Sequence, residues 1–159
     1  MFKLYHALGF IWVLPVSILG WLFMGLMFLL KQVEHVHIYP DLTFVWDLRN
    51  TGWFHKSMYN RWFGFTVGNN IVVVDLGESA ANGRGFLHER RHAMQNYCLG
   101  VLFFPVYILE CLRILAFCKD KHAYLDNFFE RDARKYAGQT VDIPRSQWMD
   151  GPEDAWPWW

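Results

Sequence analysis

An apolar segment of 24 residues without a formal charge, Ala7 to Leu30, constrains this chain more than any other feature. A helix of that length measures about 36 Å, and the hydrocarbon core of a bilayer is about 30 Å thick. The segment lacks the small-residue cleavage site of a signal peptide, so we expect residues 1–32 to persist as an anchor in a lipid bilayer. Pro15 leaves two forms open, a single kinked span or a re-entrant helical hairpin around Leu14 to Gly20.

Composition supports association with a membrane and argues against nucleic acid as a partner. The 15 Lys and Arg balance 15 Asp and Glu, so the chain lacks the net positive charge of general DNA- or RNA-binding proteins. Charged residues make up 19% of the chain, below the roughly 25% of soluble domains. The three cysteines lack CxxC spacing and indicate free thiols. Arg84, Arg90 and Arg91 favour placing the bulk of the chain on the cytoplasmic side.

The middle of the chain, residues 33 to 75, is typical of β-structure. Its clearest signal is a hairpin with strands at Phe63 to Val67 and Ile71 to Asp75, joined by Gly68-Asn69-Asn70. We expect the Gly and both Asn to supply turn conformations with positive φ. A stretch rich in Gly, Ser and Asn, residues 77–85, predicts a loop before a helix that begins near Phe86. The fold class we predict is therefore α+β.

A second apolar stretch, Cys98 to Cys118, is interrupted by Pro105, Glu110 and Arg113. These interruptions favour a helix packed in the core or lying at the membrane surface over a second span. From residue 142 onward the chain is rich in Trp, Pro and acidic residues, which predicts an irregular tail over 142–159.

The motif that carries chemistry is His88-Glu89-Arg90-Arg91-His92, an HExxH sequence. On a helix, histidines four residues apart lie on one face and can share one metal ion, for which Zn²⁺ is well suited. The Glu89 carboxylate is turned about 100° around the helix, so it can reach a metal-bound water without occupying a coordination position. Glu89 is therefore the predicted general base. A chance match on a solvated helix is the alternative interpretation of so short a motif.

A catalytic zinc site needs a third protein ligand from a second rigid element. The best candidate is Glu130, which begins a polar helical stretch over 127–136, with the small Ala133 one turn later allowing close helix approach. The next candidate is His122. The other acidic candidates are Glu110, Asp126 and Asp132.

These motifs resemble gluzincin-type zinc metallopeptidases, specifically small bacterial membrane-associated proteins that combine an apolar N-terminal segment with a minimal HExxH domain. Departures from the family pattern are Phe128, where the family has Pro, Asp132, where it has a longer acidic residue, and Asn69, where it has His. The resemblance rests on Trp12-Val13-Leu14-Pro15, Leu19-Gly20, Gly64-Phe65-Thr66-Val67-Gly68, His88-Glu89-Arg90-Arg91-His92-Ala93-Met94-Gln95, Leu99-Gly100 with Tyr107, and Tyr124 to Ala133.

The resemblance implies a minimal zincin-like domain over residues 33–141 and a bacterial-type inner-membrane location. It implies zinc held by His88, His92 and Glu130, with Glu89 as base, and a hairpin edge that can pair with an extended peptide. It also makes Gln95 and Asn127 residues that orient the ligands, although Asn127 equally suits a helix cap.

The predicted function is hydrolysis of peptide bonds in a peptide or protein substrate. For stabilising the oxyanion we rank Tyr124 and His122 equally, and Tyr107 is also of the right type. The alternative is a non-enzymatic membrane scaffold with a structural or vestigial zinc site, which a fourth protein ligand would favour.

Overall fold

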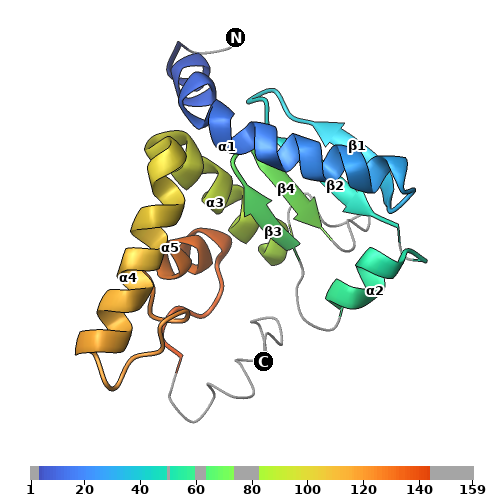
Figure 1. Cartoon of the computed structure of the whole chain (residues 1–159). Helices are drawn as coiled ribbons and strands as arrows, with labels where there is room; N and C mark the ends of the chain where they lie inside the picture. The colour runs from blue at the N-terminus through green and yellow to red at the C-terminus, as the bar shows by residue number, and fades with distance from the viewer. Residues whose placement is uncertain (1–3, 50, 60–63, 74–82, 144–159) are drawn as a thin grey trace.

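The structure is a computed structural model that describes residues 4–49, 51–59, 64–73 and 83–143 (Figure 1). An N-terminal helix, two pairs of strands and a C-terminal run of helices follow one another along the chain, which confirms the mixed α+β class, whereas a zincin-like fold stays a prediction. The elements are α1 (Leu4–Leu29), β1 (Val33–Ile38), β2 (Phe44–Leu48), α2 (Trp53–Tyr59), β3 (Gly64–Val67), β4 (Asn70–Val73), α3 (Arg84–Leu99), the short 3₁₀ helix η2 (Gly100–Leu102), α4 (Phe103–Phe117) and α5 (Phe128–Ala137).

The N-terminal segment forms one continuous helix, α1, with Pro15 inside it. The re-entrant hairpin is therefore wrong. Proline lacks a backbone N–H, so the helix loses one hydrogen bond at Pro15, but it continues on both sides of that residue. Figure 1 shows α1 bending in its first half and then lying across the sheet. Met24 and Met27 share a core cluster with Val33, Leu48 and Val72, so α1 packs as part of the folded unit and not as a detached tether.

The four strands form one sheet in the order β1-β2-β4-β3. The predicted hairpin is present as the antiparallel pair β3 and β4, and β1 pairs antiparallel with β2. Gly68 has the expected positive φ of 63°. The same expectation for the asparagines is wrong: neither has a positive φ, and Asn70 is already the first residue of β4. A parallel pairing between β2 and β4, with α2 in the connection, completes the sheet.

Helices cover both faces of the sheet. The α1 face holds the cluster around Met24 and Met27, and on the opposite face Phe86 and Ala93 of α3 pack on Val45, Ile71 and Val73. The alternation of β-strand side chains explains this arrangement, because Val72 points to α1 while its neighbours point to α3. The three layers hold α3 rigidly, and α3 carries the HExxH motif.

The second apolar stretch forms α4, and it is not a core helix. Among its residues only Phe103 and Ile114 are buried, and its apolar outer face is exposed. The expectation that this stretch packs in the core is therefore wrong. A break at Gly100, with φ 56°, separates α4 from α3. Two helical stretches, Leu8–Leu29 and Arg84–Phe117, are long and apolar enough to cross a membrane.

Several expectations fall on residues outside the described part of the chain. These are Phe63, Val74 and Asp75 at the ends of the predicted hairpin strands, most of the loop over 77–85, and the Trp-rich tail beyond residue 143. At the start of the tail, Asp142 forms an ion pair with Arg131, with 2.9 Å between Arg131 Nη1 and Asp142 Oδ1.

Candidate metal centre

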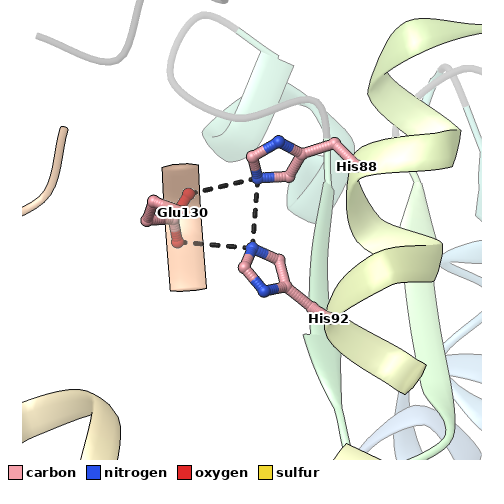
Figure 2. A group of neighbouring side chains, drawn as sticks. All are labelled: His88, His92 and Glu130. Carbon is pink, nitrogen blue, oxygen red and sulfur yellow. Dashed lines mark hydrogen bonds and ion pairs between the residues drawn. The ribbon is translucent and has the colours of Figure 1, made fainter. Parts of the chain in front are cut away.

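The two histidines of the HExxH motif lie one turn apart on α3 and face a carboxylate from α5. His88 Nε2 lies 3.1 Å from His92 Nε2 and 3.1 Å from Glu130 Oε2, and His92 Nε2 lies 3.3 Å from Glu130 Oε1. Figure 2 shows both rings pointing from one helix toward the Glu130 side chain. All three residues are buried, and they can hold a metal ion.

Local sequence places Glu130 at this point. The Asn127 side chain accepts a hydrogen bond from Phe129 N–H and begins α5, which puts Glu130 in the first turn, where the helix dipole favours a carboxylate. Ala133, one turn later, is fully buried. Its small side chain lets α5 pack closely on α3.

Gln95 determines how His92 is oriented. Its amide nitrogen donates to Phe129 O at 3.1 Å and to Asp132 Oδ2 at 2.8 Å, so its oxygen must be the atom that lies 2.8 Å from His92 Nδ1. His92 Nδ1 is therefore a donor, and in the neutral ring Nε2 then carries the lone pair. Arg91 fixes Asp132 in turn with two hydrogen bonds, at 2.7 and 3.1 Å.

The donor atoms fit a cation. His88 Nδ1 faces Gln139 Oε1 at 3.0 Å, so its Nε2 also directs a lone pair into the centre. Glu130 Oε2 is buried and receives no well-directed hydrogen bond from the described residues. Burial opposes ionisation of Glu130, yet the neighbouring His92 and His88 rings outweigh it and hold the pKa of this carboxyl well below its usual value. Burial opposes protonation of His92, yet the Glu130 carboxylate outweighs it and raises the pKa of His92 to about 9. The metal-free centre thus holds its positive charge as a proton, and a bound cation would take that proton's place between the three donor atoms.

Glu89 lies beside this centre without belonging to it. Its side chain is buried, and Thr66 of β3 contacts it through a hydrogen bond from Oγ1 to Oε2 at 2.8 Å. Glu89 is thus held at the sheet side of the centre. A carboxylate there is free to accept a proton from a group bound between the metal ligands and the sheet.

A cavity of about 490 Å³ opens at the centre. One wall is β3, which is an edge strand of the sheet, and the opposite wall is apolar and comes from α4. The floor carries Glu89 and the metal-ligand group, which consists of His88, His92 and Glu130. The lining residues are Gly64, Phe65, Thr66, His88, Glu89, His92, Phe103, Phe104, Tyr107, Ile108, Tyr124 and Glu130.

Two tyrosines face the centre, whereas His122 does not line the cavity. Tyr107 OH donates to Glu130 Oε1 at 2.9 Å. Tyr124 lines the cavity, and burial together with the nearby Glu130 carboxylate raises its pKa well above the usual value, so the hydroxyl keeps its proton. His122 Nδ1 instead accepts the backbone N–H groups of Tyr124 and Leu125, so it shapes the turn that presents Tyr124.

The remaining candidate ligands have other partners. Glu110 pairs with Arg113 at 2.6 Å, Asp126 accepts from the backbone N–H of His122 at 2.8 Å, and Asp132 holds Arg91. Sequence reasoning did not single out Thr66 as a functional residue. The only available signal was its place in a hairpin strand, which does not indicate contact with Glu89.

Comparisons of this chain with protein-family models, with curated proteins and with solved structures find no match. The resemblance to gluzincin-type metallopeptidases therefore stays a prediction from the motifs. What the chain does has to be argued from the centre itself.

Proposed function

We propose that this chain is a membrane-associated zinc metallopeptidase, with His88, His92 and Glu130 as the zinc ligands. The observation that carries the proposal is the convergence of these three buried side chains in a cavity that also contains Glu89. Two imidazoles and one carboxylate are a donor set that Zn²⁺ accepts in catalytic sites, with a position left for water or substrate.

When bound, zinc would supply a Lewis acid and lower the pKa of a coordinated water. Glu89 accepts the proton of the attacking water and then delivers it to the amine of the leaving group. The Thr66 hydrogen bond holds the Glu89 carboxylate in place for this task. Tyr124, protonated and at the cavity wall, donates a hydrogen bond to the oxyanion.

The edge strand β3 supports a peptide as the substrate. Its residues Gly64, Phe65 and Thr66 line the cavity, and an extended chain can add to a sheet alongside its edge strand. A peptide that pairs with β3 places its backbone between the strand and the metal ligands. The apolar wall of Phe103, Phe104 and Ile108 suits large apolar side chains.

The alternative, a scaffold with a structural zinc site, needs a fourth protein ligand that closes the coordination sphere. Within the described ranges, the metal-ligand group has three members, and its open side faces the cavity. This favours the peptidase.

The experiment compares zinc content and peptide cleavage in detergent-purified wild type, Glu130→Ala, His88→Ala and Glu89→Gln. We expect about one zinc per chain in the wild type and in Glu89→Gln, loss of zinc in the two ligand variants, and loss of cleavage in all three variants. Cleavage is measured by identifying the new peptide termini that appear when a complex peptide mixture is incubated with each protein. The matched control is Glu34→Gln, which changes an exposed carboxylate on β1. Full activity of Glu89→Gln contradicts the peptidase, and a zinc-free wild type after metal reconstitution contradicts the site.

A further inference from the structure

The surface that most needs an explanation is the outer face of α1. Its inner face is buried at Val13, Val16, Gly20, Met24 and Met27, which recur at helical spacing. Over residues 8–29 the opposite face is exposed and carries no charged side chain. Its large members are Leu8, Ile11, Trp12, Ile18, Leu19, Leu22, Phe23, Leu26 and Leu29, with exposed fractions from 41% to 77%.

This apolar face continues from α1 onto α4. Gly100 of η2 packs so closely on α1 that an added Cβ would lie 2.5 Å from Trp12 Nε1. Val101 and Leu102, the next residues, are exposed, and so are Phe104 and Ile108, which also line the cavity. The apolar surface therefore extends from α1 to the rim of the cavity.

The packing of α1 is inconsistent with a helix that crosses the bilayer. The folded unit covers the inner face from Gly9, which approaches Tyr97, to Met27, which packs on Val33. That length is about 27 Å, nearly the full thickness of the hydrocarbon core. A transmembrane α1 would place its packing partners at bilayer depth, including β1 with exposed Glu34 and His37. Charged side chains at that depth are strongly disfavoured.

We propose that α1 lies in the plane of the membrane surface, with its outer face and that of α4 immersed in lipid and the cavity rim at the lipid boundary. This arrangement keeps β1 and the charged residues in water and covers the apolar face along its whole length. The occupant is lipid, because the stretch Leu8–Leu29 is uncharged throughout and as apolar as a membrane-spanning helix. Added to the proposed function, the arrangement makes the substrate a peptide segment that resides at the membrane interface.

The test measures the depth of spin labels along α1, so its outcome is independent of peptidase activity. The native Cys98, Cys111 and Cys118 are replaced by Ser, and single cysteines are introduced for Leu8, Leu19 and Leu29. The full chain is reconstituted in vesicles of phosphatidylcholine and phosphatidylglycerol. The power saturation of each label's electron paramagnetic resonance signal is then measured in the presence of oxygen, which is enriched in lipid, and of a nickel chelate, which stays in water. Circular dichroism checks each fold, and Ile11, Leu22 and Leu26 form a second series if a variant does not fold.

We expect the three labels to lie at one common depth, about 5–10 Å below the headgroups. A label at Ile108 should also be in lipid, and the control His37→Cys on β1 should be in water. A depth that is greatest at Leu19 and shallow at Leu8 and Leu29 would establish a spanning helix and overturn the proposal. Labels shielded from lipid, or broadened by a second copy of the chain, would overturn it in favour of a protein partner. If the label at Ile108 is in water while the labels on α1 are in lipid, the proposed position of the cavity rim at the lipid boundary would be overturned.

Discussion

At the scale of single residues, Tyr107 connects the candidate metal centre to α4, because its hydroxyl donates to Glu130. We expect Tyr107→Phe to weaken zinc binding by about 10- to 100-fold, since an unsupported carboxylate is free to rotate away from the metal. Competition with a fluorescent zinc chelator measures the affinity. The matched control is Tyr136→Phe, which removes an exposed hydroxyl from α5. Equal affinities in both variants would show that the Tyr107 hydrogen bond does not support the ligand.

The depressed pKa of Glu130 makes the stability of the metal-free protein depend on pH. The unfolded chain takes up this proton near pH 4.5, whereas the folded chain does so only at lower pH. The ionised carboxylate therefore stabilises the fold above about pH 4.5, and this contribution is lost as the pH falls toward the folded pKa. We expect Glu130→Gln to show a smaller loss of stability over that range than the wild type in chelator-treated samples. Denaturation curves at several pH values test this, and parallel curves would refute it.

At the scale of elements, the C-terminal end of α5 depends on Gly138, which has φ 67°. We expect Gly138→Ala to destabilise the protein by about 1–2 kcal/mol, because an L side chain is strained in that conformation. Gly25→Ala is the matched control, since a Cβ at either glycine meets open space and Gly25 lies inside a helix. Thermal unfolding in detergent measures both variants. The control should be neutral or more stable by up to about 1 kcal/mol.

The docking of α1 on the β3–β4 turn depends on Ser17. Its hydroxyl accepts the buried Asn69 N–H at 3.1 Å, and Gly68 lies against the same residue. We expect Ser17→Ala to cost about 1–3 kcal/mol, because it leaves a buried donor unpaired. Ser57→Ala, at an exposed position of α2, should change stability by less than about 0.5 kcal/mol. A similar effect of both changes, measured by chemical denaturation, would argue against this docking contact.

Elements with local signals were predictable from the sequence, and pairings between distant segments were not. The β3–β4 hairpin and α5 follow from turn residues, strand propensity and a cap, which all act within a few residues. The parallel pairing of β2 with β4 joins strands that are separated by α2 and β3, and no local pattern indicates it. Hydropathy likewise identified α1 as apolar but contained no information that one of its faces packs on a sheet.

The same division applies to the candidate centre. The HExxH spacing predicted that both histidines share one face, because helix geometry fixes their directions. The third ligand was a ranked choice among several acidic and histidine candidates, of which Glu130 was the first. Whether Tyr124 or His122 faces the centre depends on how the turn that contains them packs on α5, so sequence left these two residues equal. Tyr107 was named as a residue of the right type for the oxyanion, but its contact with Glu130 depends on how α4 packs on α5, and no local pattern indicated that contact.

At the scale of the whole molecule, a metal in the centre would connect α3, which packs on the sheet, to α5. We expect zinc at a hundred times its dissociation constant to stabilise the folded chain by about 2.7 kcal/mol, since the unfolded chain lacks the assembled site. Differential scanning calorimetry with and without chelator measures this change. It should vanish in His88→Ala and persist in His35→Ala, a histidine exposed on β1. An equal shift in both variants would mean that zinc binds elsewhere.

The ligands are far apart in the chain: Glu130 follows His92 by 38 residues, and α4 lies between them. During synthesis the two histidines emerge well before the carboxylate that completes the set. If the centre binds zinc as proposed, tight loading has to wait until α5 is made and docked. Metal content would then report on the maturation of the chain, and a nascent chain arrested before residue 127 should bind zinc only weakly.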